Sequence, residues 1–73
     1  MKPRHLTILQ RLADGERSFS YPTQELVDDL HEMAGYGWVR RVKTLRDYQQ
    51  ATDGWYLVTA IITEEGKEAL ASG

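Results

Sequence analysis

The 73-residue chain contains no cysteine, only two prolines and one phenylalanine, and no long apolar run. Without cysteine it has no disulfide framework, no thiolate nucleophile and no cysteine-based zinc site. No segment approaches the roughly 20 apolar residues of a membrane-spanning helix, and the basic N-terminus leads into an amphipathic segment without a signal-peptide core. We therefore expect a cytoplasmic protein with no membrane partner.

A strong excess of positive charge is also missing. Nine lysines and arginines stand against eleven acidic residues, so the formal net charge is −2, which argues against a surface that is basic throughout. The hydrophobic fraction of 41% and the charged fraction of 27% are typical of a globular chain, and the length predicts one domain over residues 1–73. Because so small a core contributes little net stability, we expect a homodimer, either weak or stable.

Apolar residues recur at three- and four-residue steps in two segments, and they predict helices over 3–14 and 22–34. A proline suits the first turn of each helix. Either Ser20 or Thr23 would cap the second helix, and Gly35 is expected to end it in a left-handed conformation.

The rest of the chain predicts strands over 38–45 and 55–62, with residues 15–21 as a connector. Thr63 is expected to cap a last helix over 64–71. The order is then helix, helix, strand, long loop, strand, helix. This predicts an α+β fold with a two-stranded antiparallel hairpin.

Two short motifs carry a resemblance to a known family. Residues 37–41 read Gly-Trp-Val-Arg-Arg, and residues 62–70 read Ile-Thr-Glu-Glu-Gly-Lys-Glu-Ala-Leu. They resemble the strand entry and the last strand-to-helix junction of the winged-helix superfamily, in the style of small bacterial transcriptional regulators. The resemblance implies DNA binding and makes 45–54 the wing. Gly66 lies inside a predicted helix, where glycine costs about 1 kcal/mol against alanine, so we expect a packing reason for it.

The front half departs from that family. Between the opening helix and the first strand, residues 15–34 show one good helix, so the positioning helix is missing or reduced to a turn around 18–21. The outer face of the remaining helix carries four carboxylates, which phosphates would repel. We therefore expect that this helix does not enter a DNA groove. The four carboxylates belong to Glu25, Asp28, Asp29 and Glu32.

A basic cluster is the sharpest functional signal. With regular alternation, Trp38 and Val42 would share one strand face, and Arg41 and Lys43 the other. Such a cluster is typical of a wing that contacts DNA phosphates, with glutamines reaching sugar or base edges. The alternative is a solvated edge strand whose charges prevent pairing, or that pair with the acidic helix. The candidate nucleic-acid-binding residues are Arg40, Arg41, Lys43, Arg46, Gln49 and Gln50.

The sequence gives little support for catalysis or for a metal site. His5 and His31 lie apart, and Asp28, His31 and Glu32 share a helix face without further identified ligands. We expect a non-enzymatic module with no cofactor and no metal, which binds double-stranded DNA and regulates transcription. The alternative is a protein-interaction module that does not bind DNA. Its contact residues would be Glu25, Asp28, Asp29, Glu32, Trp55 and Tyr56.

Overall fold

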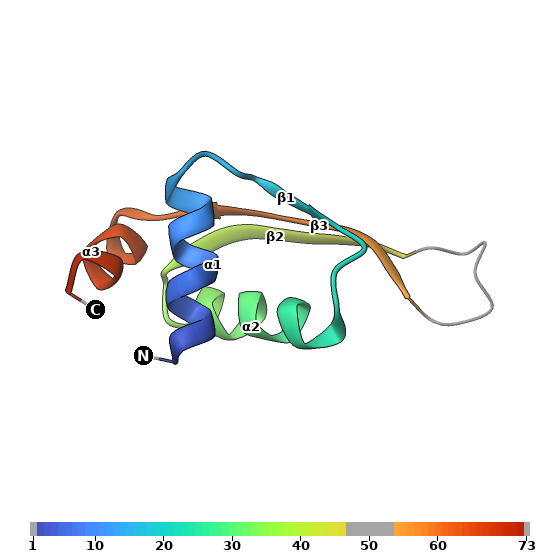
Figure 1. The fold of residues 1–73 in the computed structure, drawn as a ribbon, viewed down its shortest axis with the longest axis horizontal. Helices are drawn as coiled ribbons and strands as arrows, with labels where there is room; N and C mark the ends of the chain where they lie inside the picture. The colour runs from blue at the N-terminus through green and yellow to red at the C-terminus, as the bar shows by residue number, and fades with distance from the viewer. Residues whose placement is uncertain (1, 47–53, 73) are drawn as a thin grey trace.

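The computed structural model describes residues 2–46 and 54–72, which form three helices and three strands (Figure 1). Both long strands, the three helices and the α+β class were expected from the sequence. The elements, in chain order, are α1 (Pro3–Ala13), β1 (Ser18–Ser20), α2 (Gln24–Gly35), β2 (Val39–Arg46), β3 (Trp55–Ile62) and α3 (Glu64–Ser72).

The two long strands, β2 and β3, pair antiparallel as predicted, but the limit to two strands is wrong, because β1 adds a third strand and gives the sheet order β1-β3-β2. The order of strands and helices differs accordingly from the expected one, since β1 stands between the first two helices. Three residues, two of them serines, are too short to show a period of two. The sequence therefore predicted only a connector over residues 15–21, and the pairing of residues 18–20 with β3 makes those three a strand.

The two ends of α2 test the expected cap residues. Thr23 is the cap, since its hydroxyl accepts a hydrogen bond from the Leu26 N–H at 3.1 Å. The prediction for Gly35 is wrong, because the helix runs through it and Gly37 has the left-handed backbone, with φ +82°. That glycine turns the chain from α2 into β2.

Two bulges interrupt the pairing of β2 with β3. Arg40 pairs with Ile61 and Lys43 with Thr59, so two residues of β2 stand opposite one residue of β3 between them. Arg41 has φ +56° there, and the regular alternation expected for residues 38–45 is broken. The second shift adds one residue to β3 between the partners of Leu45 and Arg46.

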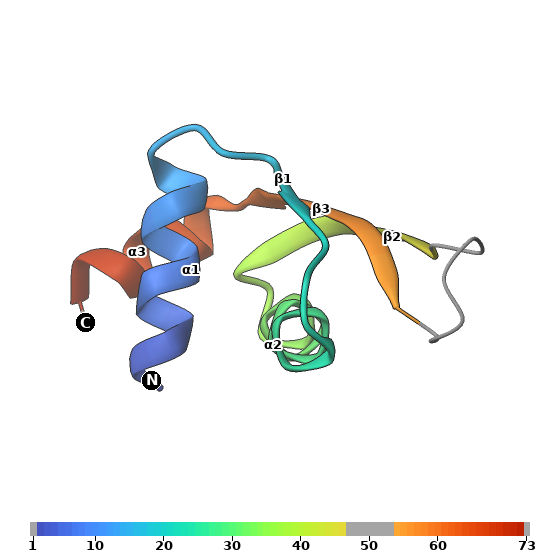
Figure 2. The same cartoon turned by 45° about the vertical axis from the view of Figure 1, so that its right-hand side comes forward.

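The sheet is covered by helices on one face. In Figures 1 and 2, α1 and α2 lie on the same side of the strands, and α3 lies beside α1 beyond the end of β3. The residues packed between the layers are apolar and almost fully buried. They are Ile8, Leu9, Leu12, Phe19, Val27, Leu30, Met33, Val39, Val58 and Ala60.

The junction between β3 and α3 confirms two expectations. The Thr63 hydroxyl accepts from the Gly66 N–H at 3.0 Å and donates to the Gly37 carbonyl at 2.6 Å, so Thr63 caps α3 and ties it to the α2–β2 turn. Gly66 is buried, and a Cβ there would lie 2.1 Å from the Trp38 carbonyl oxygen. That contact is the packing reason for a glycine inside the helix.

Among residues 2–46 and 54–72, no helix has the length and apolar character needed to cross a membrane.

Candidate nucleic-acid interface

The pairing register separates the two faces of the sheet. Residues directly opposite each other on neighbouring strands point to the same face. Ser18 and Lys43 both pair with Thr59, so these three form a row across the sheet. Phe19 and Val58 form the next row and are buried under the helices, so the Lys43 row lies on the opposite, open face. Arg40 is on that face as well, because it pairs with Ile61.

The nine basic residues fall into groups by their partners. Four of them form ion pairs with carboxylates: Lys2, Arg4, Arg11 and Lys67. Another four are exposed and have no ion pair with any residue in 2–46 or 54–72: Arg17, Arg40, Arg41 and Lys43. We call this second group the basic face. Since cations without acidic partners keep their charge available, the basic face can attract an anion.

Three members of the basic face surround one hollow. Arg17, Arg41 and Lys43 line a space of about 250 Å³ together with Ser18 and residues 59–61. Arg41 reaches this place through the bulge, and a left-handed arginine backbone is a strained state that costs on the order of 1–3 kcal/mol. Bulges commonly redirect a side chain next to a binding site. The hollow therefore combines three cations with an apolar floor.

Arg46 does not belong to the basic face. Its guanidinium lies over the Trp55 ring, 4.5 Å from the centroid, and pairs across the strands with that residue. Trp55 packs against the core and donates from Nε1 to Gln24 of α2 at 2.8 Å, so this pair is on the helix-covered side. Gln49, Gln50 and most of the expected wing lie outside the described residues.

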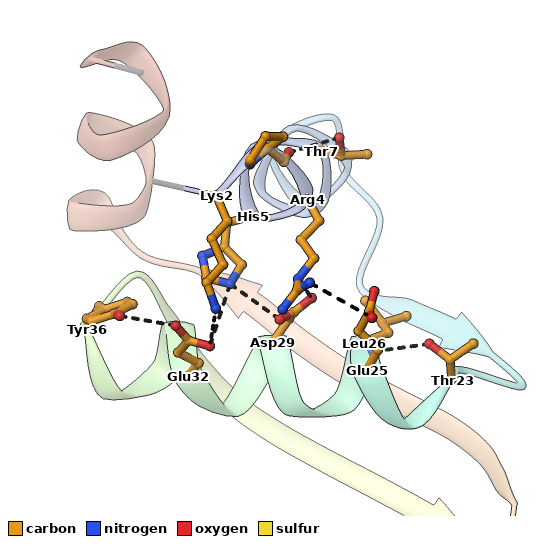
Figure 3. A network of polar contacts seen from close by, with 11 residues as sticks. Lys2, Arg4, His5, Thr7, Thr23, Glu25, Leu26, Asp29, Glu32 and Tyr36 are labelled. Carbon is orange, nitrogen blue, oxygen red and sulfur yellow. Dashed lines mark hydrogen bonds and ion pairs between the residues drawn. The ribbon is translucent and has the colours of Figure 1, made fainter.

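The prediction that Asp29 belongs to an exposed acidic face of α2 is wrong. That residue is 2% exposed, and its Oδ2 accepts from Arg4 Nε at 2.8 Å. Figure 3 shows the N-terminal end of α1 placing cations over the carboxylates of α2. Arg4 also lies 3.9 Å from Glu25, and Lys2 lies 3.4 Å from Glu32. The two cations at the start of α1 therefore offset about half of the negative charge that the sequence indicated for the four carboxylates of this helix.

The surroundings of Glu32 lower the pKa of its carboxyl group. Partial desolvation raises its pKa, but hydrogen bonds from the Tyr36 hydroxyl and the Lys2 ammonium, with the charge of Lys2, hold it below its usual range. The carboxylate is therefore ionised at neutral pH. It stays a partner for cations rather than a proton donor.

The two adjacent aromatics of β3 differ. Tyr56 is 48% exposed and stands edge-to-face with the exposed Tyr21, with ring centroids 5.5 Å apart. Trp55 is half-buried against the core. Of the aromatic contacts expected for a protein partner, only Tyr56 presents much of its ring to solvent.

Arg17 was missed by the sequence reasoning. It lies in the expected connector, far along the chain from Arg40. The Ala60 N–H donates to the Arg17 carbonyl at 3.1 Å, and this pairing brings the arginine beside Lys43. No local pattern carries that signal, because it depends on the pairing of β1 with β3.

A scan against models of known protein families, a search of curated proteins and a search of solved structures each found no match.

Proposed function

We propose that this chain is a non-enzymatic module that binds double-stranded DNA and regulates transcription, with the open sheet face and the adjoining wing against the phosphate backbone. One observation carries the proposal: the cations that lack an acidic partner within the described chain gather on the open sheet face. The members are Arg17, Arg40, Arg41 and Lys43.

The net charge of −2 is compatible with this proposal because part of the acidic charge is paired on the helix side. Two carboxylates of α2, Glu32 and Asp29, are paired with Lys2 and Arg4 on the helix side, away from the open face. A local positive potential attracts phosphates even on a weakly acidic protein. Phosphate contacts of this kind position a protein on a duplex without specifying sequence.

We include in this proposal that the chain is related to the winged-helix superfamily. The succession α1-β1-α2-β2-β3-α3 has a hairpin before a terminal helix, as the motifs at 37–41 and 62–70 suggested. Only one helix stands between β1 and β2, and its exposed side carries Asp28 and Glu25. We infer that the sheet, rather than α2, faces DNA.

The charged strand has a second explanation that the experiment must separate. β2 is an edge strand, and lysine and arginine on an edge strand discourage pairing with another chain. Charge that serves only this purpose would give no duplex binding at low salt.

The test is fluorescence anisotropy of a labelled random duplex at about 50 and 200 mM salt. Each phosphate contact contributes about 0.9 to the slope of log affinity against log salt, so four contacts lower the affinity roughly 100-fold over this range. The double variant Arg40→Ala/Lys43→Ala should lower that slope by about 1.8. Arg11→Ala/Lys67→Ala removes one arginine and one lysine from ion pairs elsewhere and should leave the slope unchanged.

Equal slopes for the two double variants would remove the basic face from the proposal. Absence of binding by the unmodified chain at 50 mM would overturn DNA binding altogether. The protein-interaction alternative would then take its place, with Tyr56 and the exposed carboxylates of α2 as the contact residues available from its expected set.

A further inference from the structure

A second cluster, remote from the basic face, joins the start of α1 to the middle of α2. His5, Asp29 and Glu32 each offer one ligand atom, and these three atoms lie within 4.8 Å of one another. His5 comes from α1, whereas the two carboxylates are three residues apart on α2 (Figure 3). Imidazole and carboxylate are the ligands of divalent transition metals such as zinc.

The surroundings of the buried His5 side chain point to a bound ligand. Its side chain is 2% exposed, and its Nε2 is buried without a hydrogen-bond partner among the described residues. Nε2 lies 3.4 Å from Asp29 Oδ1 and 3.9 Å from Glu32 Oε2, too far or too poorly aligned for a hydrogen bond. A buried polar nitrogen without a partner is uncommon, and each case asks for an explanation.

The distances suit an ion between these atoms. Two ligands about 2.1 Å from a zinc ion at a tetrahedral angle are about 3.4 Å apart. The spacing of His5 Nε2 and Asp29 Oδ1 has this value. Glu32 Oε2 must approach by a few tenths of an ångström or more, and its side chain, 34% exposed, has room to move.

The outer oxygens of both carboxylates are already held. Arg4 Nε donates to Asp29 Oδ2 at 2.8 Å, and the Tyr36 hydroxyl donates to Glu32 Oε1 at 3.1 Å. The other oxygen of each carboxylate, Oδ1 or Oε2, is the one that faces His5 Nε2. Carboxylates that bind metals are oriented by such outer hydrogen bonds.

The cluster also opens to solvent beside a cation. Lys2, His5, Glu32, Tyr36 and Trp38 line a pocket of about 380 Å³. The Lys2 ammonium lies 3.4 Å from Glu32 Oε2, and its side chain is 51% exposed, so it can leave without disturbing the core. We propose that His5, Asp29 and Glu32 bind a zinc-class divalent ion, which displaces Lys2 and takes a water as its fourth ligand.

The test is calorimetric titration of the full chain with Zn²⁺, with Mg²⁺ as a second probe. We expect one Zn²⁺ per chain and no comparable Mg²⁺ binding, since Mg²⁺ prefers an all-oxygen octahedral site. Glu32→Gln should weaken Zn²⁺ binding by about tenfold or more, and Lys2→Gln should tighten it because it removes the competing cation. Both residues are partly or well exposed, so neither variant threatens folding.

The control variant is His31→Gln, which removes the other histidine of the chain. Its Nδ1 lies 3.0 Å from the Val27 carbonyl, outside the cluster, so Zn²⁺ affinity should not change. A shift of the His5 Nε2 resonance on addition of Zn²⁺ would support direct ligation. No Zn²⁺ binding by the unmodified chain, loss of binding in His31→Gln with retention in Glu32→Gln, or equal affinity for Mg²⁺ would overturn the proposal.

Discussion

Gly66→Ala is expected to destabilise the protein although it replaces a helical glycine with the best helix former. Alanine gains about 1 kcal/mol from helix propensity. The added Cβ, however, would lie 2.1 Å from the Trp38 carbonyl oxygen and 2.9 Å from Ile62 Cγ1. The carbonyl is backbone and accepts the Thr63 N–H at 3.0 Å, so it cannot turn away without loss of that bond. Overpacking of this kind costs about 1–3 kcal/mol and sometimes more.

The nearest atom is backbone, so we place the overpacking cost at the upper end and expect a net loss of about 2 kcal/mol. For a domain of this size that lowers Tm by roughly 8–16 °C. Gly35→Ala is the matched control: it makes the same chemical change near the end of α2, where a Cβ would meet nothing within 4 Å and φ is not left-handed. It should raise stability by up to about 0.5–1 kcal/mol.

The assay is urea denaturation followed by circular dichroism, with equal slopes required before the unfolding free energies are compared. Opposite signs for the two variants would support the packing argument. If both glycines give a gain of similar size, helix propensity alone governs Gly66, and close contact between α3 and the Trp38 carbonyl is refuted.

Two further predictions concern pH and assembly. The hydrogen bond with Arg11 is the main cause that lowers the pKa of Glu16. The ionised Glu16 therefore stabilises the fold at pH values above its unfolded-state pKa of about 4.3. This stabilisation is lost as the pH falls through the lower folded-state pKa. Glu16→Gln should therefore lower stability at neutral pH and leave it unchanged near pH 2, which acid denaturation of both proteins would measure. An equal loss of stability at neutral pH and near pH 2 would contradict this reasoning. The expected homodimer stays a prediction, and the exposed large apolar residues that could contribute to its interface include Tyr21, Tyr36, Leu45 and Tyr56. Sedimentation should give a dimer mass at high micromolar concentration, and a monomer mass there would refute the dimer.

The segments with strong periodicity were predictable. Apolar steps over α1 and α2 and the dense β-forming run of β3 placed these elements within one or two residues of their observed bounds. Thr63 was recognised as a cap because capping depends on a few neighbouring residues, and it caps α3. The boundary at Gly35 was missed because two glycines so close together offer the same local signal, and only the backbone φ of Gly37 separates them.

The candidate site was predictable in part. Arg40 and Lys43 were found as members of a charged run, and the structure places both on the open face. Arg46 was grouped with them, but it follows Lys43 by three residues with no extra residue between them in β2, so it points to the opposite face, over Trp55. Arg40 and Lys43 are also three residues apart, and the first bulge is what puts both on one face. Regular alternation cannot foresee a bulge, because the extra residue leaves no trace in the polarity pattern of a strand this short.

By itself, the amino-acid sequence determined the local features of this protein: which segments outside β1 are helical or extended, that Thr63 caps the last helix, and that cations concentrate in 40–46. Tertiary structure decided which charges meet. It pairs the cations of α1 with the carboxylates of α2, buries Asp29 beside His5, and brings Arg17 to the basic face. The physical reason is range: capping and periodicity act within a few residues, whereas ion pairing and strand register join segments that are far apart in the chain.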